Sequence, residues 1–171
     1  MTMTLVSTVT VGAGGATSIA FTGIPQTGTD LLIRISSRNS GGVNAALISF
    51  NSSTTGFSAR RLFGSGSTVS SNTYTDNRGF YTSFSTDTAG TFGNCEIYIP
   101  NYSGSTNKSY SSDSVSENNA AAAYQALIAG LWSNTAAITS ISLYPTSGNF
   151  DQYSTASLYT ITKGSGGATV S

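Results

Sequence analysis

The stretch from Tyr124 to Trp132 constrains the fold of this chain more than any other segment. Read as an extended strand, it is apolar at both alternating sets of positions. One set is Ala126, Ile128 and Trp132, and the other is Leu127, Ala129 and Leu131. A strand that is apolar on both faces is typical of a central strand covered on both sides. The pattern therefore predicts a central, fully covered strand.

A second strand is predicted shortly after the first. Ile141 and Leu143 alternate with Ser140 and Ser142, which is the pattern of a half-buried strand with one solvent-exposed face. The polar segment from Ser133 to Ala137 supplies the turn between the two strands. We expect the pair to form the spine of a β-sandwich.

A helix is the alternative for the first part of this region. The alanines from Ala120 to Ala123 are good helix formers, and Ser116 is a suitable cap for a helix over 117–129. Tyr124, Ile128 and Trp132 favour a strand instead. Local propensity is a weak guide where the neighbouring sequence disagrees, so a strand at Tyr124–Trp132 is favoured, and strand and helix stay open as alternatives for Ala120–Trp132.

The rest of the chain predicts an all-β fold. About ten short strands are separated by segments rich in Gly, Ser, Asn and Pro, which is typical of a sandwich or jelly roll. The remaining predicted strands cover residues 5–11, 19–21, 31–36, 46–50, 60–63, 80–84, 95–99, 107–116 and 154–162. We expect the first two of these to form a hairpin around Gly12–Gly15, and 107–116 to be exposed.

One domain is expected from the length of 171 residues. Residues 1–163 form a jelly-roll-like antiparallel β-sandwich with a short N-terminal arm at 1–4, and 164–171 form a flexible Gly/Ser tail. The residues expected in its core are Ile33, Ile35, Ile97, Ile99, Ile128, Ile141 and Leu143.

The charge content limits the partners of this chain. Only 8% of residues are charged, and seven basic residues balance seven acidic ones. A nucleic acid or an anionic membrane is held largely by positive charge, so neither is an expected partner. No run of about 18 apolar residues is present to span a membrane. Low charge is also typical of a surface that is covered in an assembly, where charges are costly to desolvate.

Catalysis is not expected. The chain has no histidine, which is the commonest general base. A Ser-Lys dyad needs Lys108 or Lys163 with a lowered pKa, and neither position favours it. The acidic residues are scattered without a spacing that favours any catalytic pair: they are Asp30, Asp76, Asp87, Glu96, Asp113, Glu117 and Asp151.

No metal or cofactor is expected either. Asp76-Asn77 and Asp113 carry oxygen ligands that suit calcium, but no Asp-x-Asp-x-Asp loop is present. The single cysteine, Cys95, excludes an intrachain disulfide, and its alternation with Ile97 and Ile99 predicts a small buried residue.

Aromatic side chains are the remaining candidates for binding. Five of them could form a platform on which sugar rings stack: Tyr98, Tyr102, Tyr110, Tyr124 and Trp132. In a β-sandwich, such residues are more often core or interface residues. Arg60-Arg61, with Phe57 and Phe63 nearby, is too small a basic spot for nucleic acid.

Several segments resemble a group of small virion proteins of tailed bacteriophages. They are FTGIPQTGTDLLIRIS (21–36), IPNYSGS (99–105), AGLWSNTAAITSI (129–141) and GNFDQYSTASLY (148–159). The resemblance implies a jelly roll that acts as a capsid decoration, or cement, protein. It further implies a homotrimer bound to the major capsid protein on the virion surface, with no catalytic residues. Similar domains occur in tail fibres, so a module that binds host glycan is the alternative.

Overall fold

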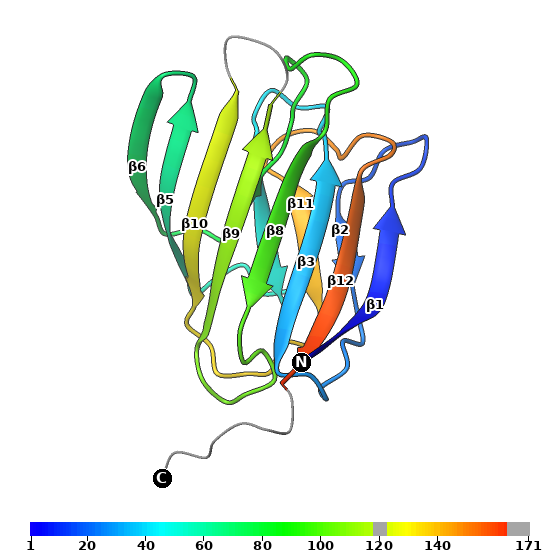
Figure 1. Cartoon of the computed structure of the whole chain (residues 1–171), viewed down its shortest axis with the longest axis vertical. Helices are drawn as coiled ribbons and strands as arrows, with labels where there is room; N and C mark the ends of the chain where they lie inside the picture. The colour runs from blue at the N-terminus through cyan, green and yellow to red at the C-terminus, as the bar shows by residue number, and fades with distance from the viewer. Residues whose placement is uncertain (118–122, 164–171) are drawn as a thin grey trace.

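The computed structural model describes residues 1–117 and 123–163, and this part of the chain is all-β without a helix. It contains twelve strands that form two antiparallel sheets packed as a sandwich (Figure 1). The strands are β1 (Thr2–Thr10), β2 (Ile19–Phe21), β3 (Asp30–Ser37), β4 (Ala45–Phe50), β5 (Phe57–Ser65), β6 (Thr68–Tyr74), β7 (Arg78–Tyr81), β8 (Gly93–Ile99), β9 (Lys108–Ser116), β10 (Tyr124–Trp132), β11 (Ile141–Pro145) and β12 (Thr155–Thr162). The predicted fold class is confirmed.

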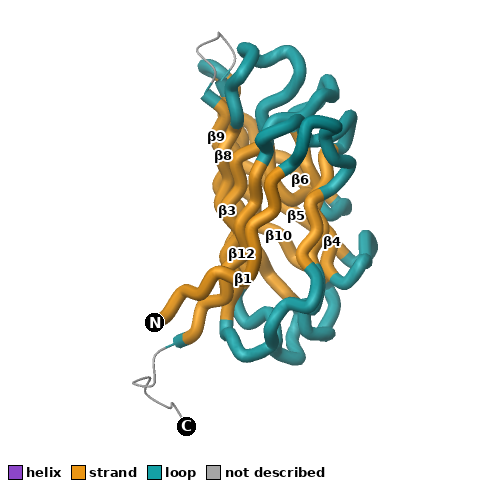
Figure 2. Tube along the Cα trace, turned by 90° about the vertical axis from the view of Figure 1, so that its right-hand side faces the viewer, coloured by secondary structure: helices purple, strands orange, loops and turns teal. Residues whose placement is uncertain are grey.

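The two sheets differ in size. The large sheet has eight strands in the order β1-β12-β3-β8-β9-β10-β5-β6, and the small sheet has four in the order β2-β11-β4-β7. Figure 2 shows the two layers from the side, with β8 and β9 in one layer and β4 in the other. Because the small sheet has half as many strands, it covers only part of the inner face of the large one.

The core lies between the sheets, and burial alternates most clearly along β8. In β8 the side chains of Cys95, Ile97 and Ile99 are buried, while Asn94, Glu96 and Tyr98 point outward. The seven residues predicted for the core are all buried: Ile33, Ile35, Ile97, Ile99, Ile128, Ile141 and Leu143. An aromatic cluster of Phe50, Phe57, Tyr110 and Trp132 forms part of this core.

The expected hairpin between β1 and β2 is wrong. β1 pairs with β12, and β2 pairs with β11 in the other sheet. The segment between β1 and β2 therefore carries the chain from one sheet to the other. The expected N-terminal arm is also wrong, because Thr2, Met3 and Thr4 already pair with Thr162, Ile161 and Thr160.

The strand predicted at Tyr124–Trp132 is confirmed as β10, and the helical alternative is wrong there. All nine residues pair with β5 on one side and with β9 on the other. β11 confirms the predicted strand at Ile141, but it lies in the small sheet, so the link after Trp132 crosses between sheets. Residues 118–122, which belong to the range of the helical alternative, and the predicted tail 164–171 lie outside the described residues.

Two strands differ from expectation in the polar part of the sequence. β9 was expected to be exposed, yet it is central, and its inner residues Ser112, Ser114 and Ser116 are buried. β6 was not predicted, because Thr68–Tyr74 shows no hydrophobic alternation. Its side chains are exposed on both faces, so no burial pattern marks it in the sequence.

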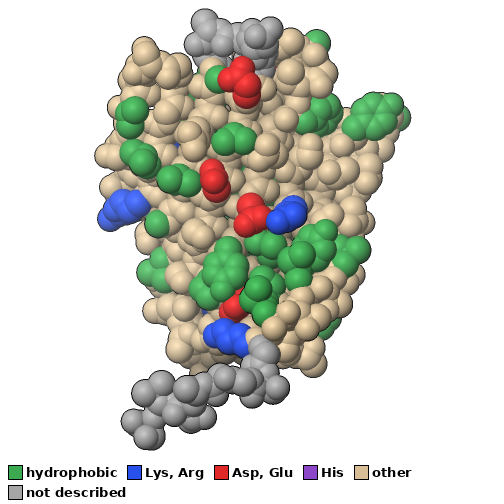
Figure 3. Space-filling model, viewed as in Figure 1, with side chains coloured by type: hydrophobic (Ala, Val, Ile, Leu, Met, Phe, Trp, Pro, Cys, Tyr) green, Lys and Arg blue, Asp and Glu red, His purple; other side chains and the backbone are tan. Residues whose placement is uncertain are grey.

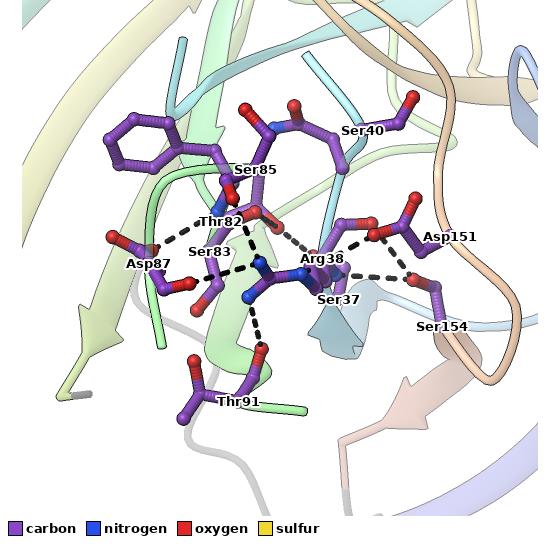
Figure 4. A network of polar contacts seen from close by, with 12 residues as sticks. Ser37, Arg38, Ser40, Thr82, Ser83, Ser85, Asp87, Thr91, Asp151 and Ser154 are labelled. Atoms are coloured by element: carbon purple, nitrogen blue, oxygen red, sulfur yellow. Dashed lines mark hydrogen bonds and ion pairs between the residues drawn. The ribbon is translucent and has the colours of Figure 1, made fainter. Parts of the chain in front are cut away.

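Arg38, just after β3, anchors a long loop to the sandwich (Figure 4). Its Nη1 and Nη2 groups donate hydrogen bonds of 3.1–3.3 Å to backbone carbonyls, and its Nε lies 3.4 Å from Asp151 Oδ2. The four carbonyls belong to Ser85, Asp87, Thr88 and Thr91. Every donor nitrogen of this guanidinium is therefore occupied within the chain.

Candidate interaction surface

The outer face of the large sheet is the face on which the second sheet does not pack. It is the face turned toward the reader in Figure 3, where apolar side chains gather in its lower half and toward its left edge. Cross-strand registers define its rows. One row runs Leu5, Tyr159, Leu32, Tyr98 from β1 to β8, and a parallel row runs Arg34, Glu96, Asp113, Leu127, Leu62 from β3 to β5.

The first apolar patch, here the β1-side patch, consists of Met3, Leu5, Leu32, Tyr98, Tyr159 and Ile161. Three of these side chains are well exposed: Met3 at 49%, Leu5 at 53% and Tyr98 at 37%. Tyr98 is fixed in place because its hydroxyl donates a 2.8 Å hydrogen bond to Oδ2 of buried Asp30, which raises the pKa of Tyr98. The patch is therefore a preformed apolar surface with one anchored aromatic ring.

The second apolar patch, here the β6-side patch, consists of Leu62, Leu127 and Val69. Leu62 and Leu127 are direct cross-strand neighbours, and Val69 lies beyond them on β6. The three side chains are 49%, 45% and 73% exposed. A shallow hollow of about 420 Å³ adjoins Leu62 and Leu127 and continues past Ala129 toward Arg60.

A polar band separates the two patches. Arg34 Nε lies 3.2 Å from Glu96 Oε2, and both side chains are at least half exposed. Glu96 and Asp113 are direct neighbours on β8 and β9, so two carboxylates face the same shallow groove of about 570 Å³. The groove also takes in Asn94 and Ser157. It is an open groove with both polar and apolar lining residues.

β10 gives the clearest difference between sequence and structure on this surface. Its inner residues are buried, as predicted, but Leu127 is exposed and Leu131 is only half-buried. The prediction that β10 is fully covered is therefore wrong for its outer face. The apolar pattern itself is the signal: the sequence supplies a second apolar face that the monomer leaves open.

Of the two lysines considered for a dyad, Lys163 is exposed and Lys108 is buried. Its Nζ donates to the carbonyls of Gly104 (2.6 Å), Thr106 and Thr135 (3.4 Å). Burial lowers the pKa of Lys108, as catalysis would need, but its contacts in the described residues are backbone carbonyls that join two loops. The geometry is that of a structural lysine.

The carboxylates considered for calcium lie in different places. Asp76 pairs with Arg78 at 2.8 Å, whereas Asp113 lies on the outer face, so the oxygens considered for calcium are apart. In residues 1–117 and 123–163, no three His, Cys, Asp or Glu side chains come close enough to share a metal ion. Cys95 is buried as predicted, and burial raises its pKa to about 12.

The five aromatic candidates do not form one platform. Tyr102, Tyr110 and Trp132 are core residues, Tyr98 belongs to the β1-side patch, and Tyr124 packs near Phe63 at 5.6 Å between ring centroids. The two neighbouring arginines also separate. Arg60 points outward, while Arg61 points inward with its guanidinium 4.2 Å from the ring centre of Phe63. Since alternate residues of a strand face opposite sides, the pair makes no basic spot.

No protein-family model, no curated protein and no solved structure matches this chain. No helix in the described part of the chain is long and apolar enough to cross a membrane.

Proposed function

We propose that this chain is a non-enzymatic structural protein that binds a protein assembly through the outer face of its large sheet. In the form that the sequence resemblance favours, it decorates the outside of a phage capsid and stabilises contacts between major capsid proteins. The observation that carries the proposal is the pair of apolar patches on the outer face of the large sheet, where Leu127, Leu62 and Leu5 are about half exposed.

The size of the surface supports a protein partner. Eight strands spaced about 4.8 Å apart and about eight residues long, at roughly 3.3 Å per residue, present a face of about 1,000 Å². A standard protein–protein interface buries about 800 Å² on each side. The outer face is therefore large enough for one such interface.

Its chemistry supports the same partner class. The two patches consist of Leu, Met, Val, Ile and Tyr, and the interface cores of proteins are depleted in charge and enriched in aromatic residues and Met. The nearby charges are of both signs, Arg34 beside Glu96 and Asp113. A strongly charged partner would therefore gain little binding free energy from electrostatic attraction to this face.

Sedimentation with capsid shells of the parent virus tests the proposal. The wild-type protein should pellet with shells, and Leu127→Gln should weaken binding at least tenfold without lowering the melting temperature. Val43→Gln is the matched control, because Val43 is also 45% exposed but precedes β4 in the small sheet. Equal binding by wild type and Leu127→Gln would contradict the use of this face.

Salt gives an independent test of how the contact is held. Exposed ion pairs contribute about 0–1 kcal/mol each and are screened by salt, whereas apolar burial is not weakened by simple salts. We expect the protein to stay on shells up to about 1 M NaCl, where the Debye length is about 3 Å. Release by NaCl alone would show that charges such as Arg34 or Arg60 carry the contact.

The polar band supports a second candidate function, a fibre module that binds host glycan. Asn94, Glu96 and Asp113 line an open groove near Tyr98, and amide, carboxylate and aromatic groups together suit sugar hydroxyls and ring faces. Binding of purified host glycan that is lost in Asp113→Asn, together with no binding to shells, would favour this function over decoration.

The homotrimer implied by the resemblance stays a prediction. A shared capsid contact does not require it, because such a protein can also bind its target as a monomer or a dimer. The molecular mass in solution is the direct measurement, and it bears on the inference that follows.

A further inference from the structure

The four edge strands of the two sheets differ in how well they are protected against pairing with another strand. Natural proteins protect such edges with short strands, bulges, proline or charge. β2 has three residues, β7 has four and meets β4 with a register shift, and β1 has a bulge between Leu5 and Ser7. β6 has none of these features, so it is the unprotected edge.

β6 is long, regular and uncharged. Its sequence, TVSSNTY, contains no proline and no ionisable side chain except Tyr74. All seven residues pair with β5 without a register shift, and every side chain except that of Tyr74 is exposed. In the described part of the chain, no strand lies beyond β6 in the sheet (Figure 1). Since alternate residues of an antiparallel edge turn their N–H and C=O groups outward, β6 offers a row of free backbone donors and acceptors.

A cluster on the inner side of the same hairpin holds this edge in place. Arg61 on β5 donates to Asn72 Oδ1 on β6, and its guanidinium lies 5.5 Å from the ring centre of Tyr74. The guanidinium of Arg78 lies 4.6 Å from the same ring centre and pairs with Asp76. These contacts tie β6 to β5 and to the start of β7. A strand that is already ordered loses little conformational entropy when it pairs.

We infer that β6 pairs edge to edge with β6 of a second copy of this chain, antiparallel about a two-fold axis. A two-fold axis places identical strands antiparallel and makes their contact self-complementary. In a register centred on Ser71, Val69 lies opposite Thr73 of the second copy, and Thr68 lies opposite Tyr74. Such β-branched and aromatic pairs are favourable, and no like charges meet.

The β6-side patch gives a second reason for this partner. Leu62, Leu127 and Val69 lie next to the open edge on the outer face. Pairing of two β6 strands would join the patches of both copies into one apolar surface across the seam. The inference is independent of the capsid proposal, and it predicts a dimer where the sequence resemblance predicts a trimer.

The contact is small, so the dimer should be weak. One seven-residue strand pair buries much less than a standard interface, and we expect a dissociation constant of roughly 10–100 µM. Sedimentation equilibrium of the full chain should show a concentration-dependent rise from 17.5 kDa to twice that mass. A mass that stays at one chain, or that rises to three chains, would overturn the inference.

A charge placed on the edge tests the site. Ser71→Lys puts two ammonium groups opposite each other near the axis, and we expect it to raise the dissociation constant about tenfold or more. Thr4→Lys is the matched control, because it adds the same charge at an exposed position of the opposite edge strand, β1. Equal effects of the two variants, or no effect of Ser71→Lys, would overturn the assignment to β6.

Two further measurements exclude a folding artefact. Ser71→Glu should also be monomeric, and an equimolar mixture of Ser71→Lys with Ser71→Glu should restore dimers through opposite charges across the seam. In the wild type, amide hydrogen exchange within 68–74 should slow as protein concentration rises, while exchange in β1 stays constant. The pairing would be contradicted if the mixture failed to dimerise. It would also be contradicted if amide hydrogen exchange in β6 did not depend on protein concentration.

Discussion

The two faces of the large sheet are built from similar residues but are covered very differently. On β10, the inner residues Ala126, Ile128 and Trp132 are at most 2% exposed, whereas Leu127 on the outer face is 45% exposed. Both sets were supplied by the same nine residues. The comparison shows that apolar alternation specifies a face suited to burial, but not whether the chain itself or a partner covers it.

The largest expected difference between the faces is in stability. Ile128→Ala removes a fully buried side chain and should lower the free energy of unfolding by about 2–5 kcal/mol. Leu127→Ala, one residue earlier on the outer face, should change it by about 0.5 kcal/mol or less. Urea unfolding of both variants measures this. Equal losses in the free energy of unfolding for the two variants would mean that the outer face is part of the core.

Gly130 gives a sharper test of the inner face. A Cβ at this position would lie 2.0 Å from the ring of buried Tyr110, its cross-strand neighbour. Gly130→Ala should therefore cost about 1–3 kcal/mol through overpacking. Ala129→Val adds volume at the neighbouring outward position and should be close to neutral. The melting temperature of Gly130→Ala should be clearly lower than that of Ala129→Val. Similar melting temperatures would contradict the packing of Tyr110 over Gly130.

High pH should weaken the packing between the two sheets, where Cys95 of the large sheet and Tyr81 of the small sheet are buried. Burial raises the pKa of Cys95 from 9.0 to about 12 and that of Tyr81 from 10.0 to about 12. The unfolded chain then releases these protons first. The contribution of the two groups to stability is therefore fully present below about pH 8 and falls as pH rises through 9 and 10, by about 1.4 kcal/mol per pH unit for each group. Unfolding of wild type and Cys95→Ala at pH 8 to 11 measures this. A wild-type slope equal to that of the variant would argue against a buried thiol.

The smallest expected effect belongs to the polar band of the outer face. Glu96→Gln removes the ion pair with Arg34, but it also removes a like-charged neighbour of Asp113. Exposed pairs contribute about 0–1 kcal/mol, so the net change in stability should lie within that range and shrink in high salt. A loss above that range at any salt concentration would show that this band is structurally essential.

Much of the fold was predictable from short-range pattern. The alternation at Cys95–Ile99 and Ile141–Leu143 identified strands and the residues they bury, because a strand with one buried face needs period-two hydrophobicity. β6 was not predictable in this way, because both of its faces are exposed and no burial selects its residues.

The candidate interaction surface was predictable only in part. The sequence contained the second apolar face of β10, but it gave no means to decide that Leu127 is open while Trp132 is covered. The same limit applied to Arg60 and Arg61, which look like one basic spot in the sequence and lie on opposite faces of β5. Assigning a face to solvent requires knowing which sheet packs on it.

The sequence by itself determined the all-β class, the lack of histidine, the low charge and seven residues of the core. Only the tertiary structure decided the partners of each strand: β1 pairs with β12 from the far end of the chain, and β11 leaves β10 for the other sheet. The physical reason is that local pattern fixes which faces of a strand prefer burial, whereas pairing is set by contacts distant in sequence. Those contacts cover one face of the large sheet and leave the other, and the edge at β6, open.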